Sequence, residues 1–162
     1  MKKKFNIIQI SPYYPPFLGG LGKVAQEISE QLALDGYRVA VITSDIQSKN
    51  MPRIETAFNL SIKRLRGFTF ANTPLILGLF WELFWTKKPA IFHLHFSQAY
   101  VPDVMWVVAK LRGISYVVHF HLDVEKSGKL GFIFDLWKKW VQPVIIRDAS
   151  AVITLSPDQS KL

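Results

Sequence analysis

The sequence predicts an α/β fold in which a doubly wound parallel sheet carries helices on both faces. Two observations predict it. Short apolar runs alternate along the chain with longer segments whose apolar residues recur at helical spacing. Several of these runs are rich in β-branched residues and apolar throughout, which is typical of strands buried on both faces of a parallel sheet. At 162 residues and 49% hydrophobic content, the chain (1–162) is expected to form one domain with its own core.

The predicted elements follow one another in a strand–helix rhythm. The first strand is expected over 5–11, and the helix after it over 22–35, closed by Gly36, which readily adopts the left-handed cap conformation. The side chains expected to face the sheet from this helix are Val24, Ile28, Leu32 and Leu34. The remaining elements are expected as strand 38–44, strand 59–65 at one edge of the sheet, helix 75–85, strand 90–95, helix 99–111, strand 115–121, helix 131–147 with a kink at Pro143, and strand 151–156.

The stretch between the first strand and its helix, 11–22, has the composition of a ligand-binding loop. Its prolines stiffen the backbone, and its glycines let a ligand approach backbone N–H groups at the positive end of the helix. In a parallel sheet, the loop at the carboxyl end of a strand faces the ligand crevice. We therefore expect Gly19, Gly20 and Tyr14 to contact an anionic or sugar ligand, with a purely structural turn as the alternative for the two glycines.

Charge and composition limit the classes of partner and site. The net charge of +8 favours anionic partners such as phosphorylated sugars, nucleotides or acidic lipid surfaces. No nucleic-acid partner is expected, because the basic residues are scattered and no nucleic-acid motif occurs. The absence of cysteine excludes disulfides and thiolate metal sites and suits a reducing cytosol. A cytoplasmic location is expected, since the N-terminus shows no secretion signal and 75–85 is too short to span a membrane.

Four histidines form two pairs near the ends of adjacent predicted strands: His93 with His95, and His119 with His121. The i, i+2 spacing puts both members of a pair on one face of the sheet. Imidazoles there can orient sugar hydroxyls. Zinc is the alternative, but neither a matched carboxylate nor a ligand spacing accompanies the pairs, so no metal is expected.

Several separate stretches resemble the amino-terminal half of a GT-B glycosyltransferase of the retaining family GT4. The matching stretches are Pro12-Tyr13-Tyr14-Pro15-Pro16 followed by Gly19-Gly20, then Asp35-Gly36-Tyr37-Arg38-Val39-Ala40-Val41-Ile42-Thr43, Phe92-His93-Leu94-His95, Tyr116-Val117-Val118-His119-Phe120-His121, and the segment from Asp148 to Ser156. Their order and spacing cover nearly the whole chain. One departure is His119, which stands where many relatives have Thr or Ser.

The resemblance implies a Rossmann-like, acceptor-side domain of an enzyme that transfers a sugar from a nucleotide-sugar donor to a glycan or lipid-linked acceptor. It implies that Gly19 and Gly20 lie against the donor phosphates and sugars, and that His121 is the catalytic histidine touching the transferred sugar. His95 and Tyr14 are expected among the substrate-binding residues. The family's front-face mechanism uses the leaving phosphate to deprotonate the acceptor, so neither a protein nucleophile, a metal nor another cofactor is expected. The C-terminal domain that grips the nucleotide is absent from these 162 residues, so the chain alone is expected to be inactive.

Two other functions stay open. The segment from Gly20 to Ala25 matches the G-x-G-x-x-A pattern of a dinucleotide-binding oxidoreductase domain, with Asp45 as the ribose ligand. In that fold, however, the glycines follow the first strand directly, whereas here a proline-rich loop intervenes. The second alternative is a non-catalytic module that binds sugars or anions.

Aromatic and basic residues gather in two segments. The first comprises Phe132, Phe134, Trp137, Trp140, Val141 and Ile145 with Lys126, Lys129, Lys138, Lys139 and Arg147, and the second comprises Trp81, Trp85, Lys87 and Lys88. Such a surface can rest on an anionic membrane, which predicts peripheral association with the inner face of the membrane. The alternative is that these aromatic residues pack on the sheet or against the absent domain.

Overall fold

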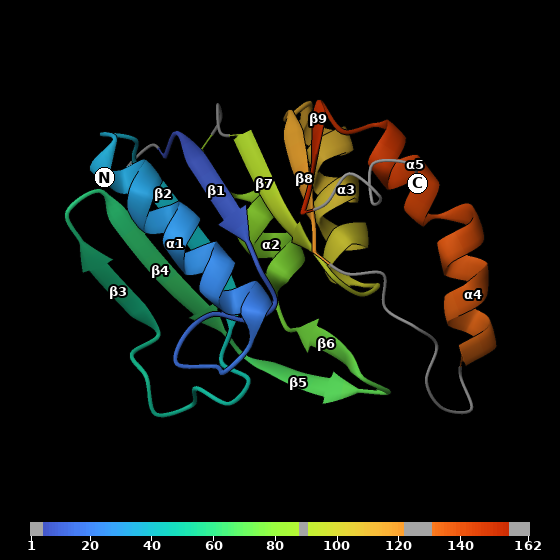
Figure 1. Cartoon of the computed structure of the whole chain (residues 1–162), viewed down its shortest axis with the longest axis horizontal. Coiled ribbons are helices and arrows are strands. Elements are labelled where there is room, and N and C mark those ends of the chain that lie inside the picture. Colours follow the sequence, from blue (N-terminus) through green and yellow to red (C-terminus); the bar gives the residue numbers. More distant parts are fainter. Residues whose placement is uncertain (1–4, 88–90, 122–130, 156–162) are drawn as a thin grey trace.

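The structure, a computed structural model, describes residues 5–87, 91–121 and 131–155. The strands are β1 (Ile7–Ile10), β2 (Val39–Ser44), β3 (Ile54–Ala57), β4 (Leu60–Leu65), β5 (Gly67–Phe70), β6 (Thr73–Ile76), β7 (Ile91–Phe96), β8 (Tyr116–Phe120) and β9 (Ala151–Thr154). The helices are α1 (Gly20–Leu34), α2 (Leu79–Phe84), α3 (Val101–Arg112), α4 (Gly131–Trp140) and α5 (Gln142–Arg147). Figure 1 shows these elements around one central sheet.

The central sheet has seven strands in the order β3-β4-β2-β1-β7-β8-β9. All neighbours pair in parallel except β3 and β4, which are antiparallel. From β1 the chain moves outward through β2 to β4, and it later returns to the other side of β1 through β7, β8 and β9. The strand order therefore reverses between β1 and β7. At such a switch point, a doubly wound sheet opens its ligand crevice at the carboxyl ends of the strands.

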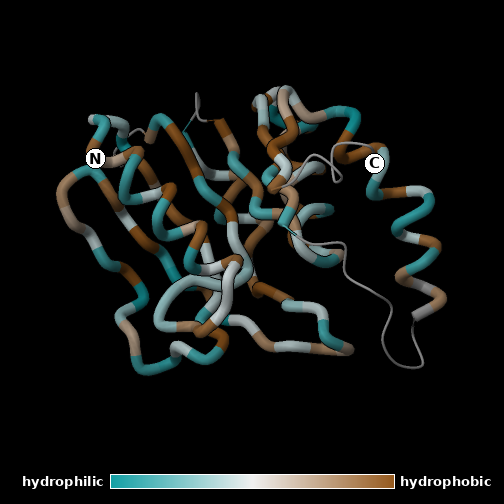
Figure 2. Tube along the Cα trace, viewed as in Figure 1, coloured by the Kyte–Doolittle hydropathy of each residue, from teal (hydrophilic) through white to brown (hydrophobic). Residues whose placement is uncertain are grey.

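The two faces of the sheet differ in what covers them. On the α3 face, alternate strand residues join α2, α3 and α5 in the main apolar core, which includes Ile10, Phe92, Leu94, Met105 and Ile145. On the α1 face, α1 packs over β2 and β4 (Figure 1). In Figure 2 much of the hydrophobic colour lies along the central strands, whereas hydrophilic residues recur along α1 and α4. The core thus sits mainly between the sheet and the helices of the α3 face.

Helix α1 buries small residues rather than the large ones predicted to face the sheet. Its buried positions are Gly22, Ala25, Ser29 and Ala33. Leu34, predicted as a core residue, is 73% exposed, and Val24, Ile28 and Leu32 are only partly buried. The prediction is wrong because small side chains let the helix approach the sheet closely: a Cβ added to Gly22 would lie 3.4 Å from the backbone of Tyr13.

Three strands were not predicted, and three predicted elements differ. Segment 59–65 is not the edge of the sheet, because β3 adds an antiparallel strand outside β4. The helix predicted over 75–85 is only the short α2, since 73–76 pairs with β5 in a hairpin. Ala71 and Asn72 both have positive φ there, as a two-residue hairpin turn requires. The helix predicted over 131–147 is divided at Val141 into α4 and α5, with Pro143 in the first turn of α5.

The other predicted strands are confirmed as β1, β2, β4, β7, β8 and β9, and α3 confirms the helix predicted over 99–111. The predicted strand ends at positions 90 and 156 lie outside the described residues. In the described parts of the chain, every helix is too short or too polar to cross a membrane.

Candidate functional site

Four histidine rings lie together on the α1 face of β7 and β8, and we call them the histidine stack: His93, His95, His119 and His121. His95 pairs in register with His119 across the two strands, and His121 follows the last residue of β8. All four side chains are buried, with exposed fractions from 0 to 9%. The prediction that each i, i+2 pair shares one face is confirmed.

The rings are stacked. Their centroids are 4.4 to 5.7 Å apart and their planes are inclined by 10 to 27° in the five ring pairs that touch. On the other face of the same two strands the alternate residues are aliphatic and phenyl side chains of the core. The carboxyl halves of β7 and β8 therefore present an apolar surface on one side and imidazoles on the other.

Hydrogen bonds connect two of the histidines to β1. The Nδ1 atom of His95 lies 2.9 Å from Nε2 of His121. The opposite ring nitrogen of His95, Nε2, is in hydrogen-bond contact with Oε1 of Gln9. Gln9 is fully buried and belongs to β1, so this contact crosses the switch point of the sheet. The sequence analysis gave Gln9 no role, although it is the polar residue within the apolar run of β1.

Burial keeps the stack neutral near pH 7. Desolvation, with a smaller contribution from neighbouring imidazoles, lowers the pKa of His93 and of His121 to about 4. The same two causes hold the pKa of His95 well below its usual range. Desolvation also lowers the pKa of His119. These rings therefore serve as neutral hydrogen-bonding groups rather than as cations.

Some polar atoms of this region are buried without a hydrogen-bond partner in the described chain: both ring nitrogens of His119, Nε2 of His93 and Nε2 of Gln9. Unpaired buried polar atoms are costly, and they mark places where water or a ligand can bind.

Metal binding is also conceivable in this region. His95, His119 and His121 each offer a nitrogen within 4.8 Å of the others, and so form a three-residue group that could hold a metal ion. Zinc would need each nitrogen at about 2.0–2.1 Å. A metal would therefore have to replace the His95–His121 hydrogen bond and turn the rings out of their stack.

Gly19 and Gly20 lie where α1 begins, at the same edge of the sheet as the ends of β7 and β8. Both are exposed, and a Cβ added to Gly20 would meet no atom within 4 Å. Gly19 is the N-cap, has an extended backbone and provides no side-chain cap. In the described part of the chain no side chain caps the first N–H groups of α1, which leaves a positive helix end at the carboxyl edge of β1.

Tyr14 does not join this arrangement. Its side chain is 3% exposed and packs with Ala25 of α1 and Val41 of β2. Burial raises the pKa of its hydroxyl to about 12. Tyr14 therefore helps to pack α1 on the sheet, and its predicted contact with substrate stays a prediction.

Hydrogen bonds within the loop, and from β2 and β4, hold the loop before α1 in place. The Ser11 hydroxyl donates to the Tyr13 carbonyl at 2.6 Å, and the Ser44 hydroxyl donates to the Pro12 carbonyl at 2.6 Å. From β4, Arg64 donates from Nη2 to the Pro15 carbonyl at 2.8 Å. The loop is thus attached to its surroundings at several points ahead of the glycines.

The dinucleotide-binding alternative fits this geometry poorly. Residues 11–19 separate β1 from α1, so the tight turn directly after the first strand is missing. Asp45, the candidate ribose ligand, instead accepts a hydrogen bond from the backbone N–H of Gly67 at 2.8 Å.

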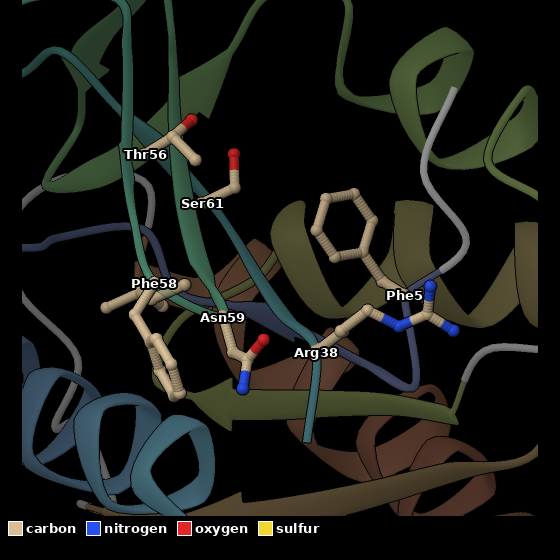
Figure 3. A pocket seen from close by; sticks show the side chains of 7 residues that line it. Phe5, Arg38, Thr56, Phe58, Asn59 and Ser61 are labelled. Atoms are coloured by element: carbon tan, nitrogen blue, oxygen red, sulfur yellow. The ribbon is translucent and has the colours of Figure 1, made fainter. Parts of the chain in front are cut away.

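A cavity of about 150 Å³ lies at the opposite edge of the sheet (Figure 3). Phe5, Arg38, Phe58 and Asn59 line it, at the points where β1, β2 and β4 begin. Ligands of doubly wound sheets bind at the carboxyl edge. We therefore assign the candidate site to the edge that carries the histidine stack and the open end of α1.

Comparison with known proteins gave matches of two kinds. Residues 19–162 match the family model described as the glycosyl transferase 4-like domain. The structure resembles sucrose-phosphate synthase from Thermosynechococcus elongatus with a TM-score of 0.67 and 19% sequence identity. That match covers 98% of this chain and 44% of the synthase chain. The comparison with curated protein sequences gave no match.

The structural match supports the fold, because sucrose-phosphate synthase is a GT-B glycosyltransferase and this chain aligns along almost its whole length with less than half of it. The predicted Rossmann-like α/β fold of a GT-B half is confirmed. The family model supports the class of protein over most of the chain. The chain therefore belongs to the glycosyl transferase 4-like domain family, as an amino-terminal GT4 glycosyltransferase domain.

Proposed function

We propose that this chain is the acceptor-side half of a retaining glycosyltransferase, which transfers a sugar from a nucleotide-sugar donor to a glycan or lipid-linked acceptor. One observation carries the proposal: His121, hydrogen-bonded to His95, directly follows β8 at the edge of the sheet where α1 begins without a side-chain cap from Gly19. Two strand steps separate β1 from β8, and neighbouring strands lie about 4.8 Å apart. A sugar diphosphate is long enough to contact both places.

The chemistry of glycosyl transfer assigns a role to each part. A leaving nucleoside diphosphate gains negative charge, and the open N-terminus of α1 at Gly19 and Gly20 can stabilise it. A neutral imidazole both donates and accepts hydrogen bonds, so His121 can hold the transferred sugar in position. We propose that the leaving phosphate deprotonates the acceptor, and that neither a protein nucleophile nor a metal takes part.

We further propose that this half works with a second α/β domain that binds the nucleotide. The chain spans 44% of the length of the synthase that it resembles. A donor held between two domains would be incompletely bound by one of them, so this half alone is expected to be inactive.

The test expresses this chain together with the product of the coding sequence that follows Leu162 in its gene. It then measures release of nucleoside diphosphate from a panel of nucleotide sugars. His121→Ala should lower turnover at least about 100-fold, since a group that orients the reacting sugar contributes on that scale. His93→Ala is the matched control, because His93 belongs to the same stack but forms no hydrogen bond with His95 or His121. Equal effects of both variants would refute the role of His121.

Two other results would favour the alternatives. Saturable binding of NAD or NADP by the chain, without consumption of any nucleotide sugar, would favour an oxidoreductase domain. Binding of sugars or phosphate without turnover in the presence of the second domain would favour a non-catalytic module.

For a lipid-linked acceptor, we propose that α4 and α2 rest on the anionic inner face of the cytoplasmic membrane. Phe132, Leu136 and Trp140 recur every fourth residue along α4 and are 53 to 66% exposed. On α2 and just after it, Trp81 and Trp85 are 60% and 64% exposed. Exposed aromatic residues near lysines favour the interface of an anionic bilayer.

Only part of the predicted aromatic surface faces outward. Trp137 packs against the core, with its ring centroid 6.0 Å from that of Phe96, and its Nε1 donates to Asp103 at 2.7 Å. Ile145 is fully buried in the core. The alternative prediction, packing on the sheet, therefore holds for these two residues.

Co-sedimentation with vesicles tests the membrane proposal. Binding is expected to vesicles that contain phosphatidylserine, and to fall at least about tenfold in a Phe132→Ser, Trp140→Ser variant. Leu34→Ser is the control, since Leu34 is 73% exposed on α1, away from these helices. Equal losses in both variants, or equal binding to neutral vesicles, would contradict the proposal.

A further inference from the structure

We propose that Gln9 and His95 are positioning residues that fix which ring nitrogen of His121 carries the proton. They do so through one directed chain of hydrogen bonds, from His121 through His95 to Gln9. These hydrogen bonds form within this domain, but their role in catalysis rests on the function proposed above.

The direction of the chain follows from its last member. Gln9 meets His95 with its amide oxygen, Oε1, which can only accept a hydrogen bond. The Nε2 atom of His95 must therefore carry a proton. A neutral imidazole has one N–H, so Nδ1 of His95 is the bare nitrogen and accepts. The atom 2.9 Å away, Nε2 of His121, must then be the donor.

Neutral rings are required for this reasoning, because an imidazolium would donate from both nitrogens. Burial supplies that condition, since desolvation lowers the pKa of both His95 and His121. No carboxylate or cation bonds to His95 in the described chain: its two ring nitrogens meet Gln9 and His121. With Oε1 of Gln9 as the acceptor, one arrangement of protons satisfies both ring nitrogens of His95 and Nε2 of His121.

The position of Gln9 makes it suited to this role. Gln9 lies opposite His93 in the register between β1 and β7, and its side chain reaches along the same face to His95. The contact joins β1 to β7 at the switch point, next to the loop that leads to Gly20. Gln9 is 0% exposed, so water does not compete for its oxygen.

The consequence concerns hydrogen bonding at the reaction centre. With its proton on Nε2 and directed inward, His121 has its lone pair on Nδ1. A substrate group that meets His121 at Nδ1 must donate a hydrogen bond, as a sugar hydroxyl does, whereas a carbonyl or phosphate oxygen cannot. The chain from Gln9 thus contributes to the choice of a hydroxyl-bearing sugar.

The experiment is NMR spectroscopy of the ¹⁵N-labelled 162-residue chain near pH 7, without substrate. Imidazole N–H protons ordinarily exchange quickly with water, but those in a buried chain should give sharp downfield signals. We expect two such signals, on Nε2 of His95 and Nε2 of His121, and a coupling across the hydrogen bond between Nε2 of His121 and Nδ1 of His95. Absence of these signals, or a proton on Nδ1 of His95, would overturn the proposal.

Variants distinguish the effect of the hydrogen bonds from the effect of side-chain packing. Gln9→Met keeps the volume but removes the acceptor, and should reduce the preference of His121 for its Nε2–H form, to which one hydrogen bond contributes about fivefold. His95→Phe keeps a stacked ring and should abolish the His121 signal. His93→Phe, in the same stack but outside the chain, should leave both signals in place. Unchanged His121 signals in both Gln9→Met and His95→Phe would refute the inference.

A kinetic measurement follows once the second domain is supplied. Gln9→Met should lower kcat with little change in the KM for the donor, because fewer molecules hold the productive form of His121. The NMR result stands by itself if no transferase activity is found, so the failure of the two proposals can be told apart.

Discussion

Replacing Arg64 with methionine should destabilise the domain far more than replacing its neighbour Lys63. Arg64 is 3% exposed on β4 and bonds through Nη1 to the Glu55 carboxylate, and through Nη2 to the Pro15 carbonyl at 2.8 Å. Nη1 also lies 3.3 Å from the Pro52 carbonyl. One guanidinium therefore joins β4 to β3 and to the loop ahead of α1.

Arg64→Met is expected to lower the free energy of unfolding by about 3 kcal/mol. Removing one partner of a buried ion pair costs about 3–5 kcal/mol. The Glu55 side chain is 34% exposed and can regain water, which favours the lower end of that range. Lys63→Met removes the same charge from the next residue. Its ion pair with Glu82, at 2.5 Å, is 37% and 29% exposed and should contribute only about 0–1 kcal/mol.

Urea unfolding followed by tryptophan fluorescence measures both variants. For a domain of this size, 3 kcal/mol corresponds to a decrease in Tm of about 6–12 °C. If the free energies of unfolding of Arg64→Met and Lys63→Met differ by less than about 1 kcal/mol, the reasoning about the buried guanidinium is refuted.

Three further predictions concern the site. His119→Leu should raise the free energy of unfolding by about 1 kcal/mol, because it removes two buried ring nitrogens that have no hydrogen-bond partner among the described residues; a decrease in urea titrations would contradict this. The unfolded chain binds protons at His93 and His121 with a pKa near 6.5, and the folded chain only near 4. Stability should therefore fall as the pH falls from about 6.5 to about 4, by about 1.4 kcal/mol per pH unit for each group. His93→Phe removes one of these groups, so its free energy of unfolding, measured at several pH values in this range, should depend less steeply on pH. Gly20→Ala should change stability by less than about 0.5 kcal/mol, since the added Cβ meets no atom within 4 Å, yet lower turnover if donor phosphates touch this backbone. Unchanged turnover would leave Gly20 with a structural role only.

The sequence predicted the buried half of the fold better than the exposed half. Runs such as 39–42 are apolar throughout, which is typical of a strand buried on both faces. Strand β3 has three exposed residues of four, and therefore no such pattern. Pro74, directly before the helix predicted over 75–85, fits the start of a helix, but it equally fits an edge strand such as β6.

The sequence predicted which histidines lie together at the site, but not the hydrogen bonds that join them to other strands. Alternation along β7 and β8 predicted that the histidines share a face. It did not predict that His95 meets Gln9, because that contact depends on the neighbour of β1 in the sheet, and β7 is distant in sequence. For Tyr14, the place in a glycine-rich loop predicted ligand contact, and nothing in that pattern indicated that its side chain packs under α1.

The alternation of apolar and imidazole side chains along β7 also disfavours incorrect registers of this strand in the sheet. Phe92 and Leu94 face the apolar core, and His93 and His95 face the other side. If this strand slipped by one residue against β1 and β8, its imidazoles would enter the hydrocarbon interior and its large apolar side chains would leave it. Neutral imidazoles without partners are costly there. The histidines thus disfavour incorrectly aligned sheets during folding, whether or not any sugar is ever bound.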